Sequence, residues 1–268
     1  MFKLLNKIEF PAQENRMRTI ADTKAAREIF NSSKSGNIKF LLQKRFDWMN
    51  KHINEDDVGI ELGSGAGFSR DFIKNKNLKL TDMSSDNHLD YKNVDAQKTN
   101  FENESFDYVI ASNMIHHIAY PLKLFREANR ILKKNGRLII FEAYSSIFFQ
   151  LATVIMKHEG FDFTVNVWDE KNPTSDEDDV WSGNIAVPNL IFDNKKKFNE
   201  KLGNYFSIQY EELTECLIFL NSGGVTSKTF CIPMNNFFLN ILDSVDKFLV
   251  KLFPKFFCMG RRIVLIKK

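Results

Sequence analysis

The periodicity of apolar and polar positions changes along the chain. In residues 1–56, apolar side chains recur at helical spacing, which predicts helices over 20–30 and 38–53. From Val58 to Ser145, short apolar runs of strand length alternate with amphipathic stretches. Beyond Ser145 this alternation is lost, and a helix over 147–157 is followed by a polar segment.

The alternating middle segment predicts a parallel sheet with helices on both faces. We expect its first five strands at 58–62, 78–81, 91–94, 106–112 and 137–141. A sixth strand is expected within 206–220 and a final one at 262–266. The fold class predicted is therefore α/β, a Rossmann-like doubly wound sheet of seven strands with an antiparallel last strand.

The predicted domain organisation is a helical N-terminal preface, 1–56, followed by one domain over 57–268. Within it, the polar and acidic stretch at about 158–205 is interpreted as a lid insertion on the acceptor side. Its residues Trp168 and Trp181 either stack on an acceptor or pin the lid to the core.

Composition narrows the class of protein. A net charge of +3 gives no basic excess of the kind that favours nucleic-acid binding. The three cysteines form no CxxC pair and have no His at metal-ligand spacing, so we expect no metal and reduced core thiols in a cytoplasmic protein. We expect neither a signal peptide nor a membrane-spanning segment.

Glycines alternate after the first predicted strand. Glu61 precedes Gly63, Gly65 and Gly67, and a helix is expected next. Glycine permits a tight turn and a close approach of ligand to backbone, and ligands of open α/β sheets bind at this edge. The third glycine comes one residue too early for a dinucleotide fingerprint. A carboxylate beside the loop suits an ammonium or sulfonium ligand better than a pyrophosphate.

Two further acids follow later strands. Asp82 ends the second predicted strand, where its two oxygens can accept both hydroxyls of a ribose. Asp95 follows the third predicted strand and is placed to accept a hydrogen bond from an adenine amino group.

These elements together resemble the successive motifs of class I S-adenosylmethionine (SAM)-dependent methyltransferases, closest to the broad group that includes quinone-biosynthesis enzymes. The resemblance covers about residues 57–145. It includes the segments Glu61–Gly67, Asp82, Asp95-Ala96, Ser105–Val109 and Leu124–Leu138.

The resemblance implies SAM as cofactor, with S-adenosylhomocysteine as product. It implies that the glycine loop holds the methionine part, Asp82 the ribose, Met83 one adenine face and Asp95-Ala96 the adenine edge. Residues predicted to bind the cofactor are Glu61, Gly63, Ser64, Gly65, Gly67, Asp82, Met83, Asp95, Ala96 and Asn113.

Two histidines follow the fourth predicted strand, whose end borders both donor and acceptor in the resembling family. His117, with His116 second, is the candidate base that takes a proton from an acceptor hydroxyl. Alternatively, the imidazoles pack or bind the loop backbone, because many methyl transfers need little beyond positioning.

A second resemblance concerns the acceptor. Ser182-Gly183-Asn184, Ser222-Gly223-Gly224 and a basic last strand are similar to SAM methyltransferases encoded with bacterial surface-polysaccharide genes. It implies a small-molecule or glycan hydroxyl as acceptor, including a lipid-linked sugar. A quinone precursor or other small metabolite, and a non-catalytic scaffold of this fold, are the alternatives.

Residues 236–253 form an amphipathic helix with a broad apolar stripe. Beyond Asp246, every charged side chain is positive. The helix either packs on the domain or rests on an anionic membrane, with residues 236–257 making a peripheral contact at the inner membrane face.

Overall fold

A computed structural model describes residues 3–10, 23–32, 35–157, 159–179, 181–225 and 229–268. Its centre is a six-stranded sheet of order β3-β2-β4-β5-β8-β7. The strands are β2 Gly59–Leu62, β3 Leu78–Leu80, β4 Phe106–Ser112, β5 Leu132–Ala143, β7 Phe206–Thr214 and β8 Gly260–Lys267. β3, β2, β4 and β5 run parallel, whereas β8 is antiparallel to both β5 and β7. The Rossmann-like α/β class and the antiparallel last strand are therefore confirmed.

The expected strand at 91–94 is wrong, and the sheet has six described strands instead of seven. In this segment the described residues show a single bridge, between Thr81 and Tyr91. Tyr91, Lys92 and Asn93 are exposed, and Asn93 has a φ of 54°. A left-handed residue interrupts the extended backbone, so the segment cannot continue pairing.

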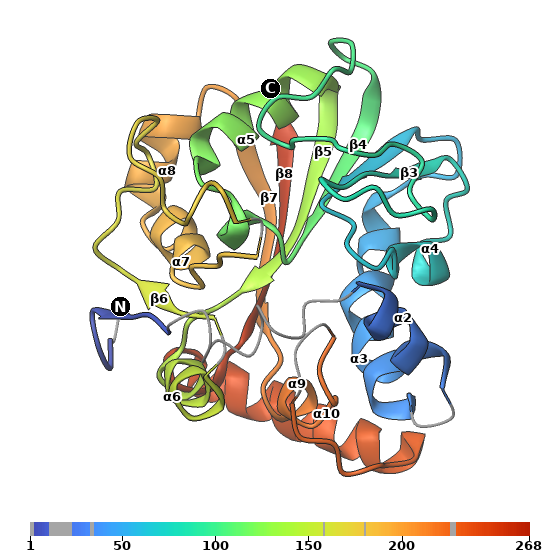
Figure 1. Cartoon of the computed structure of the whole chain (residues 1–268), viewed down its shortest axis with the longest axis vertical. Coiled ribbons are helices and arrows are strands. Elements are labelled where there is room, and N and C mark those ends of the chain that lie inside the picture. The colour runs from blue at the N-terminus through green and yellow to red at the C-terminus, as the bar shows by residue number, and fades with distance from the viewer. Residues whose placement is uncertain (1–2, 11–22, 33–34, 158, 180, 226–228) are drawn as a thin grey trace.

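Helices cover both faces of the sheet (Figure 1). One face, with Val109 and Ala111 of β4, packs against α5 Pro121–Ile131, α7 Val187–Phe192 and α8 Lys195–Leu202. The other face, with Tyr108 and Ile110, packs against α2 Thr23–Asn31, α3 Gly36–Asp47 and the neighbourhood of α4 Ser69–Phe72. Consecutive residues of one strand thus enter two separate cores, as burial on both faces requires.

The N-terminal preface contains a short strand as well as helices. β1 Lys7–Ile8 pairs antiparallel with β6 Phe161–Asp162. After α3, the 3-10 turn η1 Met49–His52 leads to the sheet. Residues 20–22 of the first predicted helix lie outside the described residues.

The stretch predicted as a lid, 158–205, has two structural roles. Its second half forms α7 and α8, whose Ile191, Phe192 and Phe198 belong to the core over the sheet. Its first half lies against the segment after β4: the amide of Thr174 donates to the Ala119 carbonyl (2.8 Å), and the amide of Asn184 donates to the His116 carbonyl (2.9 Å). The first half therefore packs directly on the segment that carries the candidate histidines.

Helices α6 Ile147–Met156, α9 Leu217–Leu220 and α10 Asn236–Leu252 gather at the end of the sheet where the parallel strands finish (Figure 1). α11 Pro254–Phe257 packs against α10 and α6. Among the described residues, no helix is long and apolar enough to cross a membrane.

Asp246 fixes how α10 is turned. This carboxylate is 2% exposed and accepts the amides of Cys216 (2.8 Å), Leu217 (2.8 Å) and Ile218 (3.0 Å) at the start of α9. A carboxylate that receives these otherwise free amides stabilises the beginning of α9. Because Asp246 faces the interior, much of the apolar stripe of α10 faces solvent.

The expectation of core thiols holds for two of the three cysteines. Cys216 and Cys258 are buried, but Cys231 is exposed, which corrects the prediction at that position. Burial raises the pKa of both buried thiols to about 12, so they remain protonated and unreactive.

Gly59 generates a stability prediction, because its strand partner Tyr108 lies across it. A Cβ at Gly59 would come within 1.9 Å of the Tyr108 ring. We expect Gly59→Ala to lower the free energy of unfolding by about 1–3 kcal/mol, the usual cost of overpacking, measured by urea denaturation. Gly36→Ala is the control, since its Cβ would meet only a carbonyl at 3.9 Å. Equal stability of the two variants would contradict the prediction.

Candidate active site

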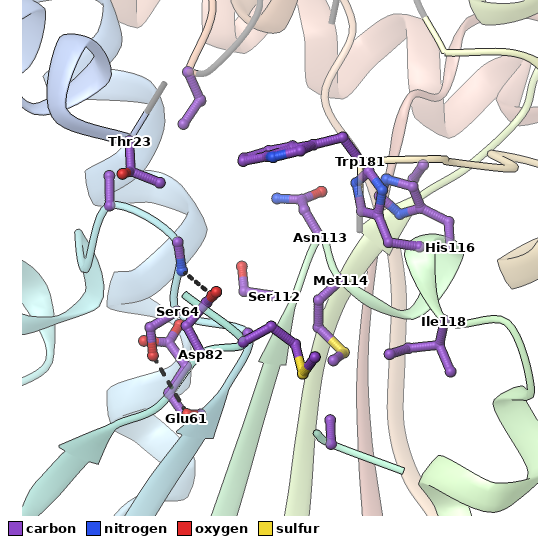
Figure 2. A pocket seen from close by; sticks show the side chains of 18 of the residues that line it. Thr23, Glu61, Ser64, Asp82, Ser112, Asn113, Met114, His116, Ile118 and Trp181 are labelled. Carbon is purple, nitrogen blue, oxygen red and sulfur yellow. Dashed lines mark hydrogen bonds between the residues drawn. The ribbon is translucent and has the colours of Figure 1, made fainter. Parts of the chain in front are cut away.

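A cavity of about 860 Å³ opens at the carboxyl ends of β2, β4 and β5. Ser64 of the glycine loop and Asp82 line one end, and His116 and Trp181 line the other (Figure 2). His117 also lines the cavity, with its ring centroid 4.3 Å from that of His116. All the residues predicted to bind the cofactor except Gly67 line this cavity, as do both candidate histidines.

The glycine loop is held by the neighbouring strand. Gly63, Gly65 and Gly67 have φ values of 68°, 51° and 69°, a region that glycine enters without strain. The Ser64 amide donates to the Thr81 carbonyl (2.9 Å), and the Gly65 amide donates to Asp82 Oδ2 (2.8 Å). A Cβ at Gly65 would meet no described atom within 4 Å, so this position faces open space.

Asp82 is anchored through both carboxylate oxygens. Oδ2 accepts the Gly65 amide, and Oδ1 accepts the amide of Ser84 (2.9 Å). Each oxygen of an ionised carboxylate keeps a further lone pair. Asp82 can therefore accept two ligand hydroxyls while its orientation is fixed by the backbone.

Glu61 is buried beneath the loop at 2% exposure. Its carboxylate accepts the hydroxyl of Ser69. Burial raises the pKa of Glu61 to about 7, and the charge of Asp82 adds to the rise. Without a cationic partner, Glu61 is therefore close to half protonated at neutral pH.

The residues predicted for adenine lie together beyond Asp82. Asp95 Oδ1 accepts the amide of Gln97 (2.8 Å), and Ala96 is buried beside it. Met83 is 49% exposed on the cavity wall, so a flat ring can lie against it. This geometry has room for an adenine, whose binding by these residues stays a prediction.

Asn113 and Met114 lie between the two ends of the cavity (Figure 2). Asn113 has a left-handed φ of 52°, and its amide donates to the Phe141 carbonyl (2.7 Å). This bond ties the end of β4 to β5 and turns the chain into η2 Ile115–His117.

Both histidines belong to a buried cluster with two glutamates. His116 Nδ1 lies 2.6 Å from Glu142 Oε2, and His116 Nε2 lies 3.1 Å from Glu159 Oε2. His117 Nε2 lies 3.3 Å from Glu159 Oε1. His117 Nδ1 is buried and has no hydrogen-bond partner within the described part of the chain.

Charge dominates this cluster. Burial opposes the charged form of His116, but Glu142 and Glu159 outweigh it and raise the pKa of His116 well above its usual value. Burial likewise opposes ionisation of Glu159, yet His117 and His116 hold its pKa well below the usual range. In the protein alone, His116 is therefore an imidazolium between two carboxylates.

Sequence reasoning missed the two glutamates. Glu142 lies on β5 and Glu159 between α6 and β6, so they are 25 or more residues from the histidines along the chain. An acid inside an otherwise apolar strand was the available signal for Glu142. Glu159 lies in an irregular segment without a motif.

The two tryptophans of the insertion have different surroundings. Trp168 packs against the core over the sheet, whereas Trp181 lines the cavity with its ring centroid 6.4 Å from that of His117. Apolar side chains complete this end of the cavity, namely Phe149, Ile185, Phe219 and Met259. This end therefore offers an apolar wall beside a charged cluster.

Comparisons with known proteins agree with this geometry. Residues 60–140 match the family model "Methyltransferase domain". A SAM-dependent methyltransferase from Archaeoglobus fulgidus superposes with a TM-score of 0.53 and 15% identity, over 92% of this chain and 100% of that one. No curated protein sequence gives a significant match.

Two other solved structures are similar at lower scores. Geranyl diphosphate methyltransferase in complex with SAM has a TM-score of 0.49 and 10% identity, over 84% of this chain and 85% of its own. A SAM-dependent methyltransferase from Methanosarcina mazei has a TM-score of 0.46 and 14% identity, over 82% and 96%.

The matched segment contains the glycine loop, Asp82, Asp95 and both histidines. Open space at Gly65 and the free lone pairs of the anchored Asp82 fit an adenosyl ligand with a cationic methionine end. Residues 60–140 therefore match a methyltransferase domain, and the cavity beside them fits SAM as the methyl donor.

Proposed function

We propose that this enzyme transfers a methyl group from SAM to a hydroxyl of a small-molecule or glycan acceptor, including a lipid-linked sugar. The observation that supports this most is one continuous cavity, which joins the donor loop to the histidine–glutamate cluster. Its volume of about 860 Å³ lies in the upper part of the usual range for ligand pockets.

The donor end is proposed to orient its ligand through the residues predicted from the sequence. SAM, when bound, supplies an electrophilic methyl group on a sulfonium that leaves as a neutral thioether. Asp82 would hold the ribose, Asp95 and Ala96 the adenine edge, and Met83 an adenine face. Glu61, Ser64 and Asn113 would surround the cationic methionine end.

The acceptor hydroxyl is proposed to lie beside the cluster. Its oxygen forms the new bond to the methyl carbon while the carbon–sulfur bond breaks, and its proton is lost at the cluster. His117 is the better placed of the two histidines, because its Nδ1 has no described partner. His116 stands behind it, engaged by both glutamates.

The apolar wall beside the cluster supports an acceptor with an apolar face. Trp181, Phe149 and Phe219 line this end, and aromatic rings of this kind stack on sugars or flat rings. An aromatic quinone precursor is the second candidate, favoured by the same wall.

We also propose a peripheral membrane contact through residues 236–257. Large apolar side chains of α10, and of Phe253 between α10 and α11, are exposed, among them Phe237 at 67%, Phe248 at 62% and Phe253 at 54%. Lys247 and Lys251 are exposed on the same helix. Exposed aromatics beside lysines suit the headgroup region of an anionic bilayer.

The proposed membrane surface lies close to the cavity. α9 packs on α10 and contributes Phe219 to the cavity, so a lipid-linked acceptor would have a short path to the cluster.

Binding of S-adenosylhomocysteine by calorimetry tests the proposal. We expect micromolar affinity, and we expect Asp82→Ala to weaken it about 100-fold, because charged hydrogen bonds to the ribose and to Gly65 are lost. Asp47→Ala, at an exposed site at the end of α3, is the matched control. Absence of binding to the wild type would favour a scaffold over an enzyme.

Glu61 makes donor binding depend on pH. Its pKa of about 7 in the free protein means that it must lose a proton to pair with the donor's ammonium. Affinity for S-adenosylhomocysteine should therefore rise from pH 5.5 to 7, by up to about tenfold per pH unit, while the ligand's amino group stays protonated. Glu61→Gln should remove this slope. The same slope in both proteins would show that Glu61 is not the titrating group.

Vesicle flotation tests the membrane contact. The wild type should float with vesicles containing phosphatidylglycerol, and less with neutral phosphatidylcholine. The double variant Phe248→Asp, Phe256→Asp should lower vesicle binding more than tenfold. Two exposed apolar anchors are then replaced by carboxylates, which the negatively charged lipid repels. Ile29→Asp, at an exposed site on α2, is the control. If the wild type stays at the bottom of both gradients, the membrane contact is refuted. If the wild type instead self-associates and the double variant does not, this face binds a second copy of the chain.

A further inference from the structure

The cluster at the acceptor end brings three metal-binding atoms to one point. One nitrogen each of His116 and His117 and one oxygen of Glu159 all lie within 4.8 Å of one another. The histidines come from η2, immediately after β4, and Glu159 comes from the segment before β6. All three side chains line the cavity.

The distances suit a common ion. Glu159 oxygens lie 3.1 Å from His116 Nε2 and 3.3 Å from His117 Nε2. Protein nitrogen and oxygen ligands bind transition metals at about 2.0–2.2 Å, which places adjacent ligands at a right angle about 3 Å apart. The three groups could therefore share one ion with small shifts.

Glu142 adds a second, independent feature. It is fully buried, accepts the amides of Ile115 (2.6 Å) and Ala143 (3.1 Å), and lies 2.6 Å from His116 Nδ1. A carboxylate on one ring nitrogen orients a metal-binding histidine and directs the lone pair of the other nitrogen to the metal. Here that other nitrogen, Nε2, faces Glu159.

The insertion packs against the third ligand. A Cβ at Gly183 would come within 2.8 Å of the Glu159 carboxyl carbon. The amide of the next residue, Asn184, donates to the His116 carbonyl (2.9 Å). The Ser182-Gly183-Asn184 segment therefore supports both Glu159 and η2, which gives this motif a structural reason.

The charge of the cluster also calls for a cation. Two buried carboxylates face two imidazoles that are neutral in their metal-binding form, so a divalent ion would balance the charge. In the protein alone the imidazolium of His116 supplies part of this balance, and metal-binding measurements separate the two cases.

We propose that His116, His117 and Glu159 bind a divalent transition-metal ion, with Glu142 as the positioning residue behind His116. Two imidazoles and one carboxylate favour manganese, iron, cobalt or zinc over magnesium or calcium. Three protein ligands leave further positions open toward the cavity. Resting on the proposed function, this inference makes an acceptor hydroxyl the occupant of one of them, where the ion would ease loss of its proton.

Metal binding to the chelator-treated full chain is the test. We expect one equivalent of Co²⁺ or Zn²⁺ by calorimetry at micromolar or tighter affinity, and for Co²⁺ a visible absorption band. His117→Ala and Glu159→Gln should each weaken binding at least 100-fold. Glu142→Gln keeps all three ligands and should weaken it about 10–100-fold. His52→Ala, which removes a histidine packed against Trp48 and Tyr210, should leave metal binding unchanged.

Binding of S-adenosylhomocysteine shows that the variants are folded, because the donor residues lie at the other end of the cavity. Wild type without binding at 100 μM metal overturns the inference, and so does equal binding by the cluster variants. If the metal fails while S-adenosylhomocysteine binds, only this inference falls, and the His117 imidazole remains the proposed base. If S-adenosylhomocysteine fails, the proposed function falls, whatever the metal does.

Discussion

The site depends on the tie between the glycine loop and the end of β3. The Ser64 and Gly65 amides donate to the Thr81 carbonyl and to Asp82, and the Thr81 amide returns a bond to the Glu61 carbonyl (3.0 Å). These bonds let the chain leave β2 in a left-handed turn without closing the cavity. They also fix the orientation of Asp82, so binding a donor costs little further ordering of the protein.

The donor end could be predicted from the sequence because its parts are local. The loop follows β2 directly, and Asp82 follows the adjacent parallel strand, so a buried strand and a turn already imply their proximity. The strand at 106–112 is predicted with its observed bounds, because a short apolar segment between polar residues is typical of a buried strand. At 91–94 the pattern was weak, and polar exposed residues with a left-handed Asn93 prevented a strand.

The acceptor end could be predicted only in part, because it is assembled from distant segments. His116 and His117 follow a motif, but Glu142, Glu159 and Trp181 reach them through the sheet order and the path of the insertion. The periodicity of α10 likewise predicted a helix but not its rotation. That rotation is set by Asp246, a polar residue within the stripe, through its bonds to the start of α9.

This division has a physical consequence for how such an enzyme acquires its acceptor. Strand ends of the sheet carry the residues proposed to hold the donor, whereas the insertion, α6 and α9 supply Glu159, Phe149 and Phe219 at the other end of the cavity. Changes in those three segments can alter the wall without disturbing Asp82 or the loop, because each segment has its own contacts with the domain. His116, on η2 after β4, and Glu142, on β5, lie at the boundary between the two halves, so their buried pair would couple the proposed acceptor chemistry to the sheet.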